Sequence, residues 1–344
     1  MSQLARLALA AVLAVAAPIL SPTAYAAGYH APRNGFGQPD LGGAWTNASL
    51  TSLQRPAMFK SLTLTEAEAV AVEKRRAAAR ATQDRPSDPK AGAPPAANDP
   101  GGYNASWTDP GVALGRIAGQ VRTSWIVDPV DGQLPYTPAG RRAYVEALRK
   151  ARNSWDGPEG RPLGERCILG FGSTAGPPML NVLYNNNYQI VQSKDAVAIL
   201  VEMNHDARII RLTDRRHPDP GIRPWMGDSV GWWEGETLVV ETTNFNPGES
   251  LRPYFGNSVL LSPNARVTER FTRLSASQIL YRFSVDDPAT YAQVWTAEMP
   301  LNAAAGPMYE YACHEGNYAL PGILAGARRA EREGGRPETV EVSE

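Results

Sequence analysis

The residue types best suited to acid–base chemistry lie near the C-terminus, where His314 and Glu315 directly follow a β-type run. A histidine and a carboxylate can exchange protons with a substrate near neutral pH. Gly316 comes next and would relax the backbone, because consecutive side chains of a regular strand face opposite sides. The structural alternative is that Glu315 pairs with an arginine and His314 caps the final helix. The first interpretation predicts a catalytic pair, and the second a surface role.

A second candidate lies in the Pro-rich loop that ends near Trp225. His217 opens this loop after Arg216, and irregular backbone with aromatic side chains often surrounds a pocket entrance. Together with the C-terminal pair, His217 and Arg216 would support acid–base elimination, isomerisation or hydrolysis without an organic cofactor.

Other side chains are candidates for ligand contact rather than proton transfer. The Asn-His-Asp sequence at 204–206 is first of all typical of a turn, and aromatic residues of β proteins more often fill the core. Such positions still contact ligands when they lie at the mouth of a barrel. The candidates are His205, Asp228, Trp225, Asn187 and Tyr318.

The sequence contains no short motif typical of a metal-binding or nucleotide-binding site. It holds neither His-Glu-x-x-His nor Cys-x-x-Cys, so metal binding by His217, His314 and a carboxylate is the less favoured interpretation, and we expect no cofactor. The glycine-rich run 170–176 lacks the lysine of a phosphate-binding loop. It also lacks the Gly-x-Ser-x-Gly spacing of a nucleophile elbow.

Several blocks resemble an uncharacterised family of secreted bacterial proteins. They are Cys167 with the Gly/Pro-rich stretch to Pro178, and the runs 214–218 (DRRHP), 226–231 (MGDSVG), 233–242 (WEGETLVVET) and 313–318 (CHEGNY). The resemblance covers residues 41 to 330 and implies export. It implies no reaction, because the family has no established activity. Asp228 stands where many of these sequences have histidine.

The elements that must position these residues are mainly β-strands. Nine runs have strand character in meander order: 189–192, 196–203, 208–212, 229–233, 237–245, 266–273, 279–285, 291–301 and 308–313. In the seventh run, apolar Ile279, Tyr281, Phe283 and Val285 alternate with the residues between them, which predicts one buried face.

Sequential antiparallel strands avoid exposed edges best by closing into a ring. We therefore predict a mainly β fold, with a closed or partly closed calycin- or lipocalin-like barrel; a two-sheet sandwich is the alternative. The Gly-x-Trp pattern at 43–45 is of the type that opens some calycin barrels.

Three helices are expected as satellites of this body. A capping box of Thr65 and Glu68 begins the first, over 66–81, and Thr137 followed by proline begins the second, which ends near residue 152. The third, over 320–332, has an apolar stripe that would pack on the barrel or plug an end. Residues 82–110 are rich in Pro, Gly, Asp and Asn and predict a surface connector.

The N-terminus predicts export. Arg6 precedes an apolar run that is too short to span a bilayer, and Ala24-Tyr25-Ala26 matches a signal peptidase site. We expect residues 1–26 to be a signal peptide and the mature protein to be periplasmic or secreted, with no membrane span. The mature chain is expected to be one domain: 27–166 forms an arm, helices and connector packed on the body, and 167–344 forms the β-meander with its final helix.

The two cysteines predict a covalent link, and the net charge limits the classes of binding partner. Cys167 and Cys313 are an even, minimal pair, which in an oxidising compartment predicts a disulfide; a reactive Cys313–His314 pair is the alternative. The formal net charge is −1, so no field attracts nucleic acid or acidic lipid. The oligomeric state stays open.

Two functions fit these observations. The first is a lyase, isomerase or hydrolase that acts on a small, partly apolar compound in a barrel pocket through His314, Glu315, His217 and Arg216. The second is a binding or carrier protein that holds such a ligand without changing it. A barrel can perform either role, so the fold alone does not decide between them.

Overall fold

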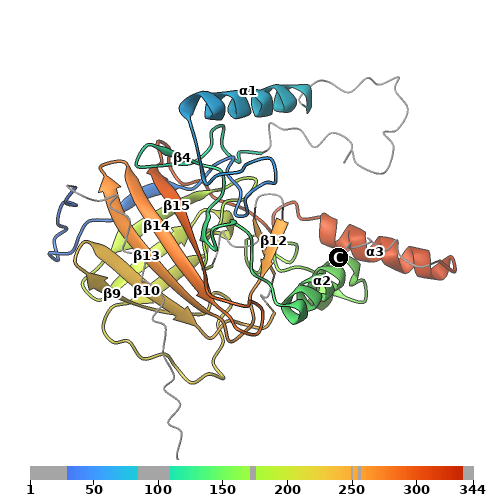
Figure 1. Cartoon of the computed structure of the whole chain (residues 1–344). Coiled ribbons are helices and arrows are strands. Elements are labelled where there is room, and N and C mark those ends of the chain that lie inside the picture. The colour runs from blue at the N-terminus through green and yellow to red at the C-terminus, as the bar shows by residue number, and fades with distance from the viewer. Residues whose placement is uncertain (1–28, 84–107, 171–175, 249–250, 255–256, 336–344) are drawn as a thin grey trace, which may run out of the picture.

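Most strands of the computed structural model belong to one closed β-barrel (Figure 1). The structure describes residues 29–83, 108–170, 176–248, 251–254 and 257–335. In order around the barrel the strands are β1 (Gly43–Thr46), β6 (Asn187–Gln192), β7 (Ala196–Val201), β8 (Ala207–Arg211), β9 (Asp228–Glu234), β10 (Thr237–Thr243), β13 (Arg266–Ser275), β14 (Gln278–Asp286) and β15 (Trp295–Ala303). Pairing of β1 with β6 on one side and with β15 on the other closes the ring, so the predicted barrel is confirmed and the sandwich is wrong.

The strand order departs from a simple meander at one step. β8 and β9 pair in parallel, with Ile210 opposite Ser229, whereas the other neighbours in the barrel are antiparallel. A parallel pair needs a connection that returns the chain to the same end of the sheet. Residues 212–227 form that connection, and they include the Pro-rich loop of His217 and Trp225.

The predicted ninth strand is wrong. Residues 308–313 form no strand, and β1 completes the barrel in their place. The reason is that β15 already pairs with β14 along one edge and with β1 and β5 (Ile126–Asp128) along the other, so no edge is left for the following segment. β1 and β5 both come from the stretch before residue 167, so that stretch contributes to the barrel itself.

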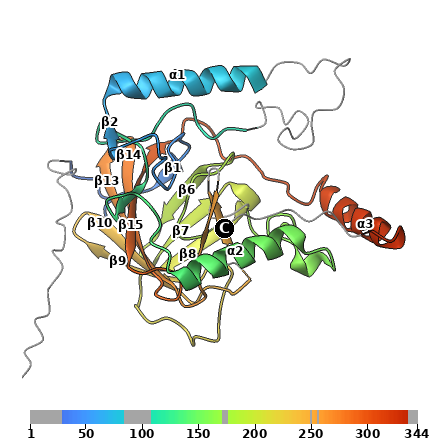
Figure 2. The same ribbon diagram turned by 45° about the vertical axis from the view of Figure 1, so that its right-hand side comes forward.

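The remaining strands form two small sheets. β2 (Thr63–Leu64), β4 (Gln120–Arg122) and β3 (Arg116–Ile117) make one, and the hairpin of β11 (Leu251–Tyr254) and β12 (Asn257–Leu260) makes the other. The hairpin lies between β10 and β13 in the chain. It therefore lies at the end of the barrel where β10 finishes and β13 begins, beside α2 (Pro138–Asn153), as Figures 1 and 2 show.

The helix boundaries agree with the predicted caps. The Thr65 N–H donates to Glu68 Oε2 over 2.8 Å at the start of α1 (Glu66–Gln83), and the Gly140 N–H donates to Thr137 Oγ1 over 2.9 Å at the start of α2. The third helix, α3 (Ala319–Arg332), neither plugs nor covers the barrel. It extends away from it (Figures 1 and 2), and Ala327 is its buried residue.

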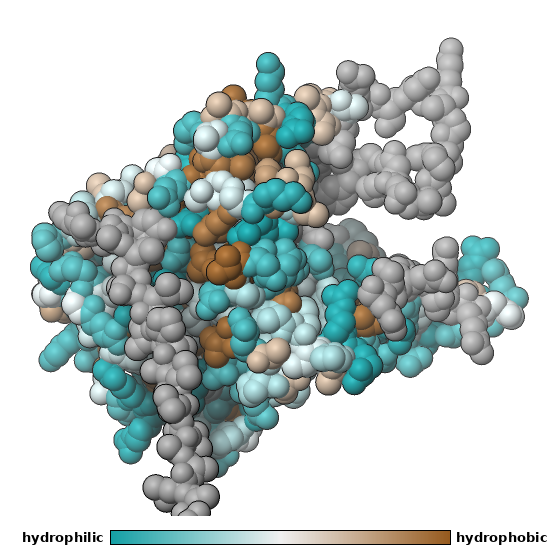
Figure 3. Space-filling view, in the orientation of Figure 1, coloured by the Kyte–Doolittle hydropathy of each residue, from teal (hydrophilic) through white to brown (hydrophobic). Residues whose placement is uncertain are grey.

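The barrel interior is packed with side chains. The alternation predicted for β14 is confirmed, because Ile279, Tyr281, Phe283 and Val285 are all fully buried in the main hydrophobic cluster. Burial of this kind stabilises by about 1.5 to 3 kcal/mol for each large apolar side chain. On the outer face seen in Figure 3, apolar residues are interspersed among hydrophilic ones.

One charged network lies inside the barrel. The guanidinium of Arg208 makes a bidentate ion pair with Glu269, and donates to Thr242 Oγ1 over 3.0 Å and to Ser229 Oγ over 3.1 Å. The Tyr281 hydroxyl donates to Glu269 Oε1 over 2.7 Å. Both charged side chains are almost completely buried, and these hydrogen bonds offset the free energy of removing them from water.

No helix of the described residues is both long enough and apolar enough to cross a membrane. The predicted signal peptide and most of the predicted connector at 82–110 lie outside the described residues.

Candidate functional site

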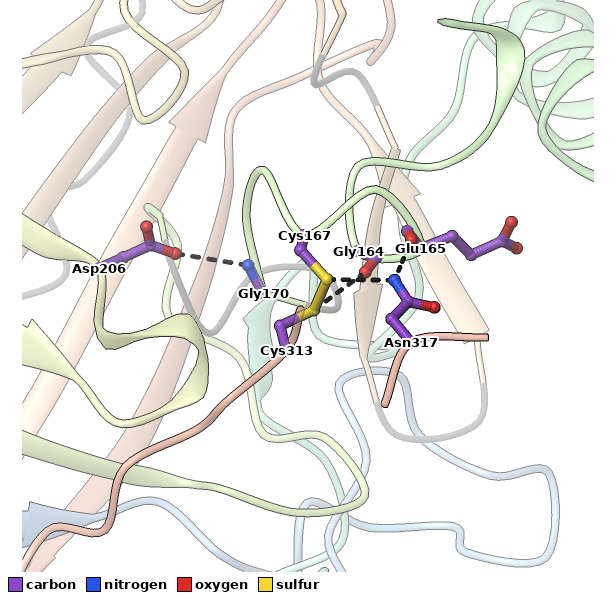
Figure 4. Close-up of a disulfide and its surroundings, with 7 residues drawn as sticks. All are labelled: Gly164, Glu165, Cys167, Gly170, Asp206, Cys313 and Asn317. Carbon is purple, nitrogen blue, oxygen red and sulfur yellow. Dashed lines mark hydrogen bonds between the residues drawn. A yellow bond between two sulfur atoms is a disulfide. The ribbon is translucent and has the colours of Figure 1, made fainter. Parts of the chain in front are cut away.

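The two cysteines form a disulfide, which confirms that prediction. It joins the loop that follows α2 to the segment that precedes α3 (Figure 4), and the Cα atoms of Cys167 and Cys313 are 5.6 Å apart. Asn317 reinforces the link, because its side-chain amide donates to the Glu165 carbonyl over 3.0 Å and contacts Cys167 Sγ at 3.3 Å. The loop is therefore held from the C-terminal side.

This loop is one wall of a groove at the barrel end, which we call the end groove. The groove has two adjoining parts, a core-side part of about 470 Å³ and a wall-side part of about 780 Å³. Leu148, Arg152, Pro253 and Ser258 line both parts, so α2 and the β11–β12 hairpin form the shared sides. Volumes in this range are typical of small-molecule sites.

The floor of the core-side part belongs to the protein core. Val182, Met203 and Tyr254 line it and are also members of the main hydrophobic cluster. Met203 begins a short 3-10 turn, Met203–His205, in which Asn204 and His205 have φ of 59° and 45°. Asparagine and histidine enter the left-handed region more readily than most other non-glycine residues, so the residue types at 204 and 205 suit this turn.

Two tyrosines present their rings to the groove with their hydroxyls already bonded. The Tyr144 hydroxyl donates to Asn257 Oδ1 over 2.6 Å, and the Tyr254 hydroxyl accepts from Gln54 Nε2 over 3.0 Å. Burial raises the pKa of Tyr254 to about 12 and also raises the pKa of Tyr144. Both phenols therefore stay neutral near pH 7 and offer apolar surface to a ligand.

The wall-side part is predominantly cationic. Its charged side chains are Lys150, Arg152, Arg161, Arg166, Glu159 and Glu165. Arg161 Nε pairs with Glu165 Oε2 at 2.8 Å and its guanidinium lies 4.8 Å from the Trp155 ring centroid, while Arg166 donates to the Glu159 carbonyl over 3.4 Å. Within the described chain Arg152 has no such carboxylate or carbonyl partner.

The C-terminal candidates do not line this groove. His314, Glu315 and Tyr318 lie in an exposed turn, where Tyr318 keeps 83% of its surface in water. The turn is attached to the groove wall by the disulfide at Cys313 and by the hydrogen bond from Asn317 to the Glu165 carbonyl, as Figure 4 shows. In the described part of the chain no hydrogen bond or ion pair joins His314 or Glu315 to His217.

His217 and Asp228 are brought together on the outer wall of the barrel. His217 Nδ1 is 2.7 Å from Asp228 Oδ2 and its Nε2 is 3.2 Å from Glu241 Oε1. Arg211 pairs with Asp228 at 2.5 Å, and Arg266 pairs with Glu241 at 2.7 Å. Each imidazole nitrogen therefore faces a carboxylate, which leaves neither free for a substrate.

The charges around Asp228 act in opposite directions on its pKa. Burial raises the pKa, but the hydrogen bonds from Arg211 and His217 outweigh burial, so the pKa lies below its usual range. Asp228 is thus held as a carboxylate. Arg216, beside His217, is an exposed residue whose backbone carbonyl accepts from Arg211 over 3.0 Å. The network attaches the loop 212–227 to the barrel.

The other predicted contact residues have different surroundings. Trp225 lines the wall-side part of the end groove, so its assignment to ligand binding stays a prediction. His205 is exposed. Asn187 donates to Glu202 Oε2 over 2.6 Å, and Glu202 Oε1 accepts from the Tyr309 N–H over 3.1 Å, which connects β6 to the segment after β15.

Sequence reasoning missed the helix face that borders the groove. Tyr144, Leu148 and Arg152 are spaced four residues apart and all line the core-side part. This spacing places them on one face of α2 and was available in the sequence. Asp206 belongs to the 204–206 turn but was not among the candidates. Its Oδ2 accepts from the Gly170 N–H over 3.4 Å at the groove wall (Figure 4), and burial raises its pKa to about 6.

In comparisons with known proteins, no family profile, no curated protein and no solved structure matches the chain.

Proposed function

We propose that the protein is an exported binding or carrier protein that holds a small, partly apolar molecule in the end groove. The observation that carries the proposal is the floor of the groove. Val182, Met203 and Tyr254 belong to the folded core and line a space of about 470 Å³, so the groove has an apolar, well-packed base. A concave site with few polar groups is the usual form of a small-molecule site.

The positions of the acid–base candidates favour binding over catalysis. General acid–base chemistry would require His314, Glu315 and His217 to approach one ligand atom to about 3 Å. The first two lie in an exposed turn, and His217 is engaged by carboxylates on the outer wall. Neither group lines the groove, so the carrier function explains the arrangement with fewer assumptions.

Export is the second part of the proposal. The segment 1–26 has the features of a signal peptide, and the sequence blocks resemble secreted proteins. The disulfide between Cys167 and Cys313 supports a periplasmic or secreted location, because such bonds persist in oxidising compartments.

The test is titration with the fluorescent probe 1-anilinonaphthalene-8-sulfonate. We expect saturable binding to the wild-type protein and at least a tenfold loss in Leu148→Trp, because Leu148 lines both parts of the groove and the larger ring would obstruct the place where they meet. Ala143→Trp is the matched control, since Ala143 lies on the exposed face of the same helix. Equal affinity in both variants, or no binding to the wild type, would overturn the proposal.

A further inference from the structure

We infer that the ligand of the end groove is a monocarboxylic acid with an apolar body, and that Arg152 binds its carboxylate; this inference rests on the proposed function. Arg152 lies where the two parts of the groove meet, because it lines both. It also shares a helix face with Tyr144 and Leu148. A ligand on the apolar floor would therefore extend toward this guanidinium.

The pairing of the groove's arginines singles out Arg152. Arg161 is engaged by Glu165, and Arg166 by the Glu159 carbonyl. Among the described residues, no carboxylate lies within ion-pair distance of Arg152. A planar guanidinium with free donors matches a carboxylate in bidentate geometry, which makes arginine the side chain of choice for this anion.

The charge of the surroundings supports an anion. Four cationic and two acidic side chains line the groove, whereas the whole chain carries a formal net charge of −1. Lys150, near Arg152 on the last turn of α2, adds to the positive field. The C-terminal end of α2 opposes it with about half an elementary charge, which the two full charges exceed.

The apolar part of the groove fits the other end of such a ligand. Tyr144, Leu148 and Tyr254 line the same part of the groove as Arg152, whose own side chain is exposed to solvent. The same side chains would bury the apolar body of the ligand, so both ends of an amphiphilic acid have a complementary surface.

The test compares dodecanoate with dodecanol and with dodecyltrimethylammonium, each below its micelle concentration or solubility limit, by isothermal titration calorimetry. We expect the wild type to bind dodecanoate about tenfold more tightly than dodecanol, and the cation most weakly. Arg152→Gln is expected to lose about tenfold in affinity for dodecanoate and to keep its affinity for dodecanol.

The control is Arg142→Gln, which removes one arginine from the exposed face of α2 and is expected to bind all three probes as the wild type does. Thermal melts of both variants confirm that they fold. Equal binding of dodecanoate and dodecanol, or an unchanged affinity in Arg152→Gln, overturns the inference and leaves the proposed function standing. Absence of binding by every probe, including the fluorescent one, overturns both.

Discussion

Asp206 lies at the groove wall, and its protonation is coupled to folding. Burial raises its pKa to about 6 in the folded protein, whereas an unfolded aspartate titrates near 3.9. A carboxyl with a raised pKa binds its proton more tightly when folded, so stability is lost as pH rises from about 4 through about 6.

This gives the first prediction. Asp206→Asn stays neutral at every pH, and its side-chain oxygen can still accept from the Gly170 N–H. We expect its melting temperature to exceed that of the wild type by a few degrees at pH 7 and to match it at pH 4. Scanning calorimetry at both pH values measures this, with exposed Asp195→Asn as the control. A variant that is less stable at pH 7 would show that Asp206 is needed as an anion.

Asp228 is the opposite case, and the second prediction concerns it. Its pKa is lowered in the fold, so its contribution to stability is full above about pH 4 and is lost as pH falls through the lowered value. We expect Asp228→Asn to lose about 2 kcal/mol in urea unfolding at pH 7, because hydrogen bonds from Arg211 and His217 lose their charged acceptor.

Two results complete that experiment. Groove binding of the fluorescent probe should be unchanged in Asp228→Asn, because the network lies on the outer wall, and exposed Asp214→Asn in the same loop should lose little stability. Loss of probe binding without loss of stability would instead place the ligand at His217 and Asp228.

At the scale of elements, the wall of the groove depends on its covalent link. The third prediction is that replacing Cys167 and Cys313 together by serine lowers the free energy of unfolding by about 4 to 5 kcal/mol, because the bond closes a loop of 146 residues in the unfolded chain. Probe affinity should also fall, since the wall from 158 to 170 loses its attachment to the C-terminal segment. Wild-type affinity in this variant would mean that Asp206 and Asn317 hold the wall alone.

Elements with strong local signals were predictable from the sequence. The alternation in β14 and the caps of Thr65 and Thr137 depend on neighbouring residues and were confirmed. The run 308–313 has the composition of a strand, but pairing depends on which edges are already occupied, and β15 had none free. The local sequence pattern does not show which strands compete for the same edge, because those strands are distant in the sequence.

The candidate site was less predictable for a similar reason. Histidines and carboxylates were chosen as candidates because they can transfer protons. In the structure, however, His217 is bonded to carboxylates and His314 lies in an exposed turn. The groove instead is built from α2, which ends at Asn153, and a hairpin that begins at Leu251, far away in the sequence. The spacing of Tyr144, Leu148 and Arg152 was visible, but its partner surface was not.

At the scale of the whole molecule, the barrel interior holds a buried ion pair among packed apolar side chains. The fourth prediction is that Glu269→Gln destabilises the protein by about 3 to 5 kcal/mol, because Arg208 stays buried without a counter-charge. Replacing both, Arg208→Met with Glu269→Leu, should recover most of that loss in urea unfolding. A double variant no more stable than the single one would show that the pair itself supplies the stability.

The most direct measurement of the central claim is a crystal structure of the mature protein soaked with dodecanoate. The account predicts ligand density between α2 and the β11–β12 hairpin, with the chain against Met203 and Tyr254 and the carboxylate at Arg152. Density at the outer-wall network of His217, or beside His314, would contradict it.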